Sequence, residues 1–375
     1  MSRSEKKRVI FLILLCVALS RALMYLLFGI CHGSWNCGLF IQKMNIWDSG
    51  WYRMIAEGLY PTQANDALTG QASWAFFPAF PLMVHMIWKM TSIDVNYIAV
   101  VLNAFFLCMA LYVGCQYIFL TRGNVRQGIG YIYFMTFGAY SFYFSIFYTE
   151  SLYLFLLTCA YYFMCKGEYL KMGIAGALLS LTRNTGVFFC FVILVHWIKK
   201  YQKKQDRNIA GWIKKTVKQD TLVLGTMMVP LGFFSYMTYL KYKTGDAFAF
   251  LHVQKAWGRE NVGVWKVAKD ALFMEFPPSY LGICFCIFIY LLIVLMWKNK
   301  RTEEAILPAI TLSVAASSSL MSTPRYMVGS FTMILAFTDE WKECTRLNKA
   351  LICVAAFIFE LACVHAWLNG SSLLV

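Results

Sequence analysis

An acidic residue set among aromatic residues is the first feature of the sequence that could do chemistry. Asp48 lies in the stretch Asn-Ile-Trp-Asp-Ser-Gly-Trp-Tyr at 45–52, and the string Phe-Phe-Pro-Ala-Phe-Pro follows at 76–81. A carboxylate in surroundings of low dielectric interacts strongly with a proton or a cation, which suits a general base. The alternative is an interfacial loop whose Trp and Tyr side chains anchor at the lipid headgroups.

Three further ionisable residues, Glu150, Arg183 and Arg325, lie inside or beside long apolar segments. Ionisable groups are costly there and mark functional sites by default. Each also has a purely structural interpretation. Glu150 would sit in the favourable dipole of a helix N-terminus, Arg183 would snorkel to the interface, and Arg325 would simply follow a span end marked by proline. Taken together with Asp48, the three favour a polar cavity that opens to the membrane face on which Asp48 lies.

A basic stretch later in the chain offers a second kind of chemistry. His252, Lys255 and Arg259 are spaced by three and four residues, so a short helix would carry all three on one face. Such a face would suit a phosphate at the membrane surface. An amphipathic interfacial helix with a solvated basic face is the alternative.

The elements that position these residues are membrane spans. The chain is 59% hydrophobic and 14% charged, whereas soluble proteins average roughly 45–50% and about 25%. This composition excludes a soluble, disordered, fibrous or disulfide-stapled secreted protein. It predicts an all-α polytopic membrane protein, with residues 1–375 as a single integral membrane domain. The apolar segments lie at about 9–30, 76–90, 98–120, 129–147, 150–165, 172–197, 221–241, 279–297, 305–321, 326–337 and 350–368.

The basic clusters predict how these segments are oriented. Residues 199–218 carry eight Lys or Arg residues against one Asp, so we expect a cytoplasmic loop there, with the N-terminus on the same side. The loops 31–75 and 242–278 are nearly charge-balanced and are expected on the opposite, extracytoplasmic face, with 31–75 as the catalytic loop. Segment 76–90 is short and contains two prolines. We interpret it as re-entrant, which requires segment 172–197 to break near Arg183.

The net charge of +15 does not indicate a nucleic-acid partner. The Lys and Arg residues form short clusters beside apolar runs, where anionic lipid headgroups supply the counter-charge. Membrane lipids are therefore the expected partners of these clusters.

Taken in order, the motifs resemble the PIG-V family of mannosyltransferases and its bacterial relatives. The family adds the second mannose to the glycosylphosphatidylinositol (GPI) precursor. The matching stretches are Trp-Asp-Ser-Gly-Trp-Tyr at 47–52, Ala-Glu-Gly at 56–58, Ala-Phe-Phe-Pro-Ala-Phe-Pro at 75–81, Tyr-Thr-Glu-Ser-Leu at 148–152, Ala-Gly-Ala-Leu-Leu-Ser-Leu-Thr-Arg-Asn-Thr-Gly at 175–186 and Pro-Arg-Tyr at 324–326. The lengths of the apolar segments predict about nine to eleven transmembrane helices, and the resemblance implies that they form a GT-C glycosyltransferase bundle. It also implies a dolichyl- or polyprenyl-phosphate mannose donor, a glycolipid acceptor and catalysis on the lumenal face, and Asp48 matches the catalytic acid of the family.

The residues and the resemblance together define an expected site for an inverting hexosyltransferase. Asp48 takes the proton from the acceptor hydroxyl, with Glu150 as a second catalytic carboxylate and Glu57 as the alternative base. The remaining site residues divide into those that would bind the donor phosphate, namely Arg183, Asn184, His252, Lys255 and Arg325, and those that would line the substrate, namely Trp47, Trp51, Tyr52, Glu57 and Trp74. We expect no metal and no cofactor, because a lipid-phosphate donor already carries its leaving group.

Two other classes of function remain open at this point. A secondary transporter would also contain intramembrane charges and broken helices, but the chain shows no repeated halves. A non-catalytic membrane subunit would tolerate Asp48→Asn. The expected location is the endoplasmic reticulum membrane for a eukaryotic protein and the plasma membrane for a bacterial one, with a small membrane subunit as a further possible partner.

Overall fold

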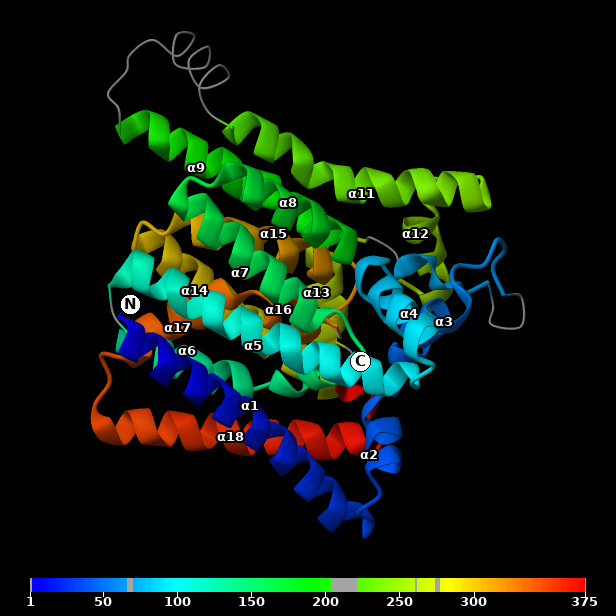
Figure 1. Ribbon diagram of the computed structural model, residues 1–375, viewed down its shortest axis with the longest axis horizontal. Coiled ribbons are helices and arrows are strands. Elements are labelled where there is room, and N and C mark those ends of the chain that lie inside the picture. Colours follow the sequence, from blue (N-terminus) through cyan, green and yellow to red (C-terminus); the bar gives the residue numbers. More distant parts are fainter. Residues whose placement is uncertain are drawn as a thin grey trace.

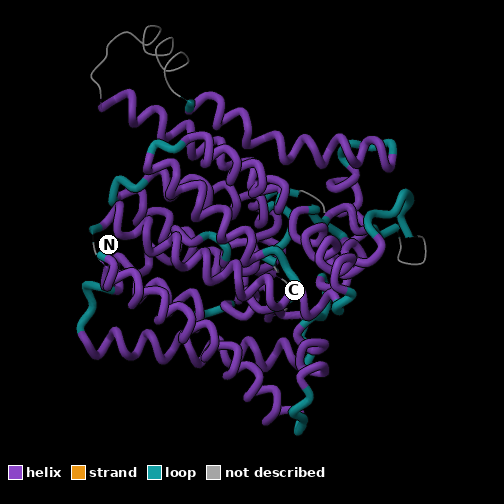
Figure 2. Tube along the Cα trace, in the orientation of Figure 1, coloured by secondary structure: helices purple, strands orange, loops and turns teal. Residues whose placement is uncertain are grey.

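The computed structural model describes residues 2–65, 70–123, 125–203, 221–259, 262–273, 277–320 and 322–374. Within these ranges the regular elements are helices, apart from one isolated bridge between Asn65 and Gln71. Figure 2 shows the same all-helical trace. Most of the basic loop 199–218, from residue 204 on, lies outside the described residues.

Long helices form the body of the molecule and run roughly parallel to one another (Figure 1). Four of them are long and apolar enough to cross a membrane: α1 (Arg3–His32), α5 (Val95–Arg122), α11 (Leu222–Thr244) and α18 (Arg346–Leu368). The other helices of the bundle are α6 (Val125–Phe137), α7 (Glu150–Lys166), α8 (Tyr169–Thr182), α9 (Phe189–Lys203), α14 (Pro277–Lys298), α15 (Thr302–Ala316), α16 (Thr323–Val328) and α17 (Phe331–Trp341). The fold class is therefore that of an all-α polytopic membrane protein.

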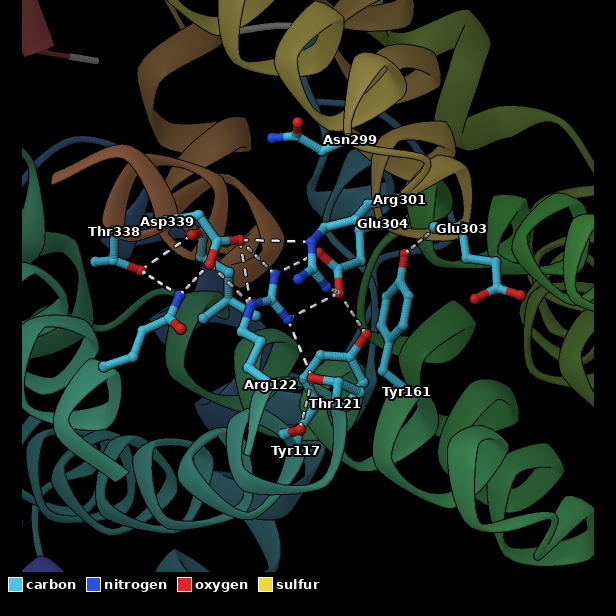
Figure 3. A network of polar contacts seen from close by, with 12 residues as sticks. Tyr117, Thr121, Arg122, Tyr161, Asn299, Arg301, Glu303, Glu304, Thr338 and Asp339 are labelled. Atoms are coloured by element: carbon cyan, nitrogen blue, oxygen red, sulfur yellow. Dashed lines mark hydrogen bonds and ion pairs between the residues drawn. The ribbon is translucent and has the colours of Figure 1, made fainter. Parts of the chain in front are cut away.

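The bundle has two polar ends, which we name after a residue at each. At the Asp48 end, α7 begins with Glu150. At the Arg122 end, α5 finishes with Arg122, which binds Glu304 and Asp339 (Figure 3). Because an α-helix rises 1.5 Å per residue, the 28 residues of α5 span about 42 Å. The two ends are therefore about one membrane thickness apart.

Short helices gather at the Asp48 end: α2 (Cys37–Met44), α3 (Ser49–Gly58), α4 (Ala79–Thr91), α12 (Ala249–His252) and α13 (Val264–Phe273). In Figure 1, α3 and α4 lie side by side at the right of the bundle, α12 lies beneath the end of α11, and α2 lies beside the ends of α1 and α18. Helix α4 packs beside α3, where His85 Nδ1 lies 2.6 Å from the carbonyl oxygen of Ala56, and α5 begins at Val95. Segment 76–90 thus returns toward α3, in agreement with the re-entrant interpretation.

Helix α8 is held close to α11 by glycine. A Cβ on Gly232 would fall 1.9 Å from the carbonyl oxygen of Ala177, and a Cβ on Gly225 would fall 2.2 Å from that of Tyr169. Small residues let helix backbones approach closely, which is how helices associate in a membrane. Ser180 Oγ adds a hydrogen bond of 2.6 Å to the carbonyl oxygen of Val229. This contact fixes the end of α8 and with it the residue that follows, Arg183.

Two apolar segments are broken where the sequence suggested continuous spans. Helix α6 stops at Phe137, and residues 138–149 are irregular apart from a short 3₁₀-helix at Ser141–Ser145. The segment 326–337 is split between α16 and α17 at Gly329 and Ser330. Periodicity within each segment could not show these breaks, because they depend on partners from elsewhere in the chain.

The irregular segment 138–149 is possible because distant side chains satisfy its backbone. Asn45 Oδ1 accepts a hydrogen bond of 2.7 Å from the N–H of Phe147, and Asn103 Nδ2 donates to the carbonyl oxygen of Ile146 at 2.5 Å. Glu360 accepts from the N–H and the hydroxyl of Ser141 at 3.0 and 2.9 Å. Irregular backbone at membrane depth is tolerated only when it is buried and paired in this way. The segment delivers Thr149 and Glu150 to the Asp48 end.

Candidate active site

Asp48 occupies the N-cap position of α3 but does not cap the helix. An N-cap carboxylate usually accepts a hydrogen bond from the first backbone N–H groups, whereas the Asp48 side chain makes no such bond. Its Oδ2 lies instead 2.5 Å from Nη1 of Arg325, and 18% of the side chain is exposed. The preceding residue, Trp47, has a φ of 55°, a left-handed conformation that turns the chain into α3. The local backbone therefore directs the carboxylate away from its own helix.

Glu150 is the carboxylate that joins the two arginines. It is the first residue of α7 and is completely buried. Its Oε1 accepts hydrogen bonds from Nη2 of Arg183 and, at 3.2 Å, from Nε of Arg325. A helix N-terminus stabilises a negative charge at that position. Glu150 does not line the pocket described below, so its geometry is that of a residue that holds the arginines in place.

Arg183 lies in the break between α8 and the 3₁₀-helix η4 (Asn184–Phe188). The chain is extended there, and Gly186 packs against α8 so closely that a Cβ would fall 2.4 Å from the carbonyl oxygen of Leu179. Arg183 Nε donates to the hydroxyl of Thr149 at 2.9 Å. Its Nη1 is buried and has no hydrogen-bond partner. The break near Arg183 was expected from the sequence, and its effect is to aim a guanidinium at Glu150.

Arg325 approaches from the C-terminal part of the chain. Proline favours the first turn of a helix, and Pro324 lies in the first turn of α16, just before Arg325. The guanidinium carbon lies 4.3 Å from the ring centroid of Tyr148, in a cation–π contact. Arg325 thus connects Asp48 with Glu150, and we refer to Asp48, Glu150, Arg183 and Arg325 together as the Asp48 network.

The Asp48 network borders a cavity of about 70 Å³. A cavity needs about 10–15 Å³ for one water, so this one has room for several waters or a phosphate-sized group. Aromatic side chains from both halves of the chain pack together at its edge: the ring of Trp257 lies 5.4 Å from that of Trp51 and 6.2 Å from that of Phe76. The lining residues are Asp48, Tyr52, Ala75, Phe76, Phe77, Thr182, Arg183, Asn184, Gln254, Trp257, Arg259, Arg325 and Tyr326.

The structure brings together only part of the site expected from the sequence. Asp48, Tyr52, Arg183, Asn184 and Arg325 line the cavity, and Trp51 packs at its edge against Trp257. Trp47 is 44% exposed, Glu57 is exposed, and Trp74 donates from its indole to the carbonyl oxygen of Pro61 at 2.9 Å. Trp47, Glu57 and Trp74 therefore lie outside the lining, and Trp74 anchors the loop.

His252 and Lys255 also lie outside the cavity, on the exposed surface. The expectation of one basic helical face is wrong, because α12 ends at His252 and a 3₁₀-helix, η5 (Val253–Trp257), follows. His252 pairs instead with Asp246 at 2.6 Å. Burial acts to raise the pKa of Asp246, but hydrogen bonds from His252 and from the N–H of Phe248 outweigh it and hold that pKa below its usual value.

The segment 254–259 contributes three lining residues: Gln254 and Trp257 were not singled out from the sequence, and Arg259 was expected on a basic helical face. Their position depends on the turn after η5, where Gly258 adopts a φ of 66°. A glycine that follows a short helical pattern is the one available signal for such a turn. It could not show that the turn leads Arg259 back to the cavity.

Comparison with known proteins supports the fold of the bundle. No protein-family model matches the sequence, and no curated protein sequence matches it. Among solved structures, the chain resembles ArnT from Cupriavidus metallidurans bound to undecaprenyl phosphate, with a TM-score of 0.52 and 13% sequence identity. ArnT is a membrane glycosyltransferase of the GT-C class. The match covers 90% of this chain and 62% of ArnT. The chain therefore has a GT-C fold and spans less than two thirds of the length of this neighbour.

Proposed function

We propose that this protein is an integral membrane glycosyltransferase that uses a lipid-phosphate sugar as its donor. The observation that carries the proposal is the pairing of Asp48 with Arg325 at the border of a cavity that Arg183 also lines. A carboxylate beside two guanidiniums supplies both a base and phosphate ligands. The GT-C fold supports the assignment, and so does the undecaprenyl phosphate bound to ArnT.

In the proposed reaction, a hydroxyl of the acceptor attacks the anomeric carbon of the donor sugar. The bond from that carbon to the phosphate oxygen breaks, the new glycosidic bond forms with inversion, and the hydroxyl proton passes to Asp48. The second oxygen of Asp48, Oδ1, has no hydrogen bond in the described part of the chain and is the atom we assign to the proton. The leaving lipid phosphate takes the electron pair, and Arg183 and Arg325 stabilise its charge.

For the substrates, we propose mannose or a related hexose on dolichyl or polyprenyl phosphate, and a glycolipid acceptor. The support is the resemblance of the motifs at 47–52, 75–81, 148–152, 175–186 and 324–326 to the PIG-V family. The activity would then belong to GPI-anchor biosynthesis in the endoplasmic reticulum of a eukaryote. In a bacterium the same reaction would act on a plasma-membrane glycolipid. Asn184 lines the cavity beside Arg183 and is the proposed hydrogen-bond donor to the phosphate or sugar.

Two experiments test this proposal. Purified protein in lipid nanodiscs should release polyprenyl phosphate from polyprenyl-phosphate mannose when a membrane glycolipid extract is added, and should not do so without an acceptor. Cells that lack the protein should accumulate the acceptor without the added hexose, which for the PIG-V assignment is a glucosaminyl-inositol lipid with one mannose. No transfer from any polyprenyl-phosphate hexose would contradict the glycosyltransferase assignment. Transfer without that intermediate would contradict the GPI assignment alone.

A further inference from the structure

Among the described residues, Arg259 is the cation of the cavity that forms no ion pair with a carboxylate. It follows Gly258, lines the cavity, and donates from Nη2 to the hydroxyl of Ser322 at 2.8 Å. In the described part of the chain it forms no ion pair. Arg183 and Arg325, by contrast, are bound to Glu150 and Asp48. Among the described side chains, the guanidinium of Arg259 is therefore the one at the cavity without a paired carboxylate.

Arg259 also lines a second pocket, of about 50 Å³, that adjoins the first. The two share Asn184, Gln254, Arg259 and Tyr326. The second is polar, with hydroxyl groups from Thr185, Ser318, Ser319 and Ser322, and the residues that line it include no further charged group. Counting the Asp48 network and Arg259 among the residues that the structure describes, two carboxylates and three guanidiniums lie at the joined pockets, which leaves one net positive charge.

The segment that carries Arg259 is fixed to the bundle on both sides. Before it, Gln71 Nε2 donates to the carbonyl oxygen of Ala256 at 3.4 Å. After it, the N–H groups of Val262 and Gly263 donate to the carbonyl oxygen of Ser317 at 3.2 and 3.1 Å. The guanidinium is thus held in place before any ligand binds, which lowers the entropy cost of binding.

We propose that Arg259 binds the phosphate of the lipid-linked sugar, and that the joined pockets select a donor with one phosphate group over a diphosphate-linked donor. A lipid-phosphate sugar is a phosphodiester with a single negative charge, which balances the single net positive charge of the described residues at the pockets. A diphosphate donor would leave one charge uncompensated in a partly buried site, and uncompensated charge is costly there. Arg183 supports the same position for the phosphate, because its buried Nη1 has no protein partner. The inference rests on the proposed function.

The test is a binding titration of the full-length protein in nanodiscs with undecaprenyl-phosphate mannose. Arg259→Gln should weaken binding about 10- to 150-fold, the effect of losing charge-assisted hydrogen bonds, and Arg259→Lys should recover part of the affinity. Lys255→Gln is the matched control: it removes the same charge from the same segment, four residues earlier and on the exposed surface. Its affinity should equal that of the wild type. Melting temperatures of all variants identify any that are misfolded.

Two further ligands test the choice of donor. Undecaprenyl diphosphate should bind the wild type more weakly than undecaprenyl-phosphate mannose does, and neutral undecaprenol should bind all variants equally. Wild-type affinity in Arg259→Gln would overturn the role of Arg259 while leaving the glycosyltransferase proposal intact. Tighter binding of the diphosphate would overturn the selection of a single phosphate. A wild type that binds no lipid phosphate at all would contradict the proposed function itself.

Discussion

Two clusters of arginine and carboxylate side chains lie at opposite ends of the bundle, and they differ in how completely their atoms are paired. At the Arg122 end, Arg122 uses all three of its nitrogens, and both oxygens of Glu304 and of Asp339 accept hydrogen bonds (Figure 3). Tyr117 and Gln127 add donors at 2.8 and 2.5 Å. This cluster, the Arg122 network, joins α5, α6, α15 and α17.

The charged groups of the Asp48 network are paired less completely, although Oε1 of Gln127 in the Arg122 network is also buried without a hydrogen-bond partner. Oε2 of Glu150 and Nη1 of Arg183 are both buried without a hydrogen-bond partner. A buried polar atom left unpaired costs about 1–3 kcal/mol, and such atoms are rare enough in native proteins to need an explanation. The Asp48 network also borders a cavity. The difference indicates that the Arg122 network is a structural clamp, whereas the Asp48 network keeps donors and acceptors available for a ligand.

The two networks are expected to face opposite sides of the membrane, so labelling of each end should occur from one side only. With the native exposed cysteines replaced by serine, Glu57→Cys and Lys255→Cys should react with an impermeant maleimide only from the non-cytoplasmic side. Lys342→Cys, at the Arg122 end, should react only from the cytoplasmic side. The basis is the charge of the loops at the two ends. Cytoplasmic labelling of either of the first two would contradict the orientation.

The largest graded effect is expected at Asp48. Asp48→Asn should leave folding and donor binding intact and lower turnover about 10²–10⁴-fold, because the amide keeps the shape of the carboxylate but cannot accept the proton. Loss of rate with retained binding separates chemistry from structure. Glu57→Gln is the control, since Glu57 is an exposed acid nine residues later. Near-normal transfer by Asp48→Asn would move the base to Glu57 or Glu150.

A large effect of another kind is expected at Arg122. Arg122→Ala leaves Glu304 and Asp339 buried without their main partner, so the free energy of unfolding should fall by about 3–5 kcal/mol. Donor affinity of the folded fraction should not change, because the cavity lies at the other end. Lys342→Ala is the control: that side chain is 42% exposed and 3.8 Å from Asp339, and its loss should cost under about 1 kcal/mol. Denaturation curves and a donor titration of Arg122→Ala measure the two effects. A changed donor affinity in the folded protein would contradict a purely structural role for the Arg122 network.

The smallest effect is expected at His252. The His252–Asp246 pair is exposed on both sides, and such surface pairs contribute about 0.2–1 kcal/mol. His252→Gln should therefore lower stability by no more than that and leave transfer unchanged. A loss of donor affinity in this variant would restore His252 to the phosphate site and would weaken the distinction between cavity residues and surface residues.

The sequence predicted the parts of this arrangement that depend on local composition. Composition predicted the apolar helices, and the re-entrant interpretation of segment 76–90 predicted the break at Arg183. Glu150 and Arg325 were singled out as charges in apolar segments, and their roles stay predictions. The sequence could not predict that Glu150 bridges both arginines. That geometry depends on segment 138–149, whose irregular backbone is held by Asn45, Asn103 and Glu360.

The basic stretch at 252–259 is a second region whose arrangement local sequence could not predict. Its three- and four-residue spacing predicted one shared face, but the change from α12 to η5 and the turn at Gly258 separate its members. His252 and Lys255 stay on the surface, and Arg259 reaches the cavity. Packing against the rest of the protein, such as the contact between Trp257 and Trp51, decides whether such a short helix continues as an α-helix or changes to a 3₁₀-helix.

The most direct test of the difference between the two networks is a donor titration of Arg183→Lys, Arg325→Lys and Glu304→Gln, each with a melting curve. Lysine keeps the charge but loses the planar fork that matches phosphate, so donor binding in the first two should weaken by about 1.5–3 kcal/mol while the proteins stay folded. Glu304→Gln should melt at a lower temperature and bind donor as the wild type does. Unchanged donor affinity in both lysine variants, with lowered melting temperatures, would show that the Asp48 network is a clamp as well and would contradict the account.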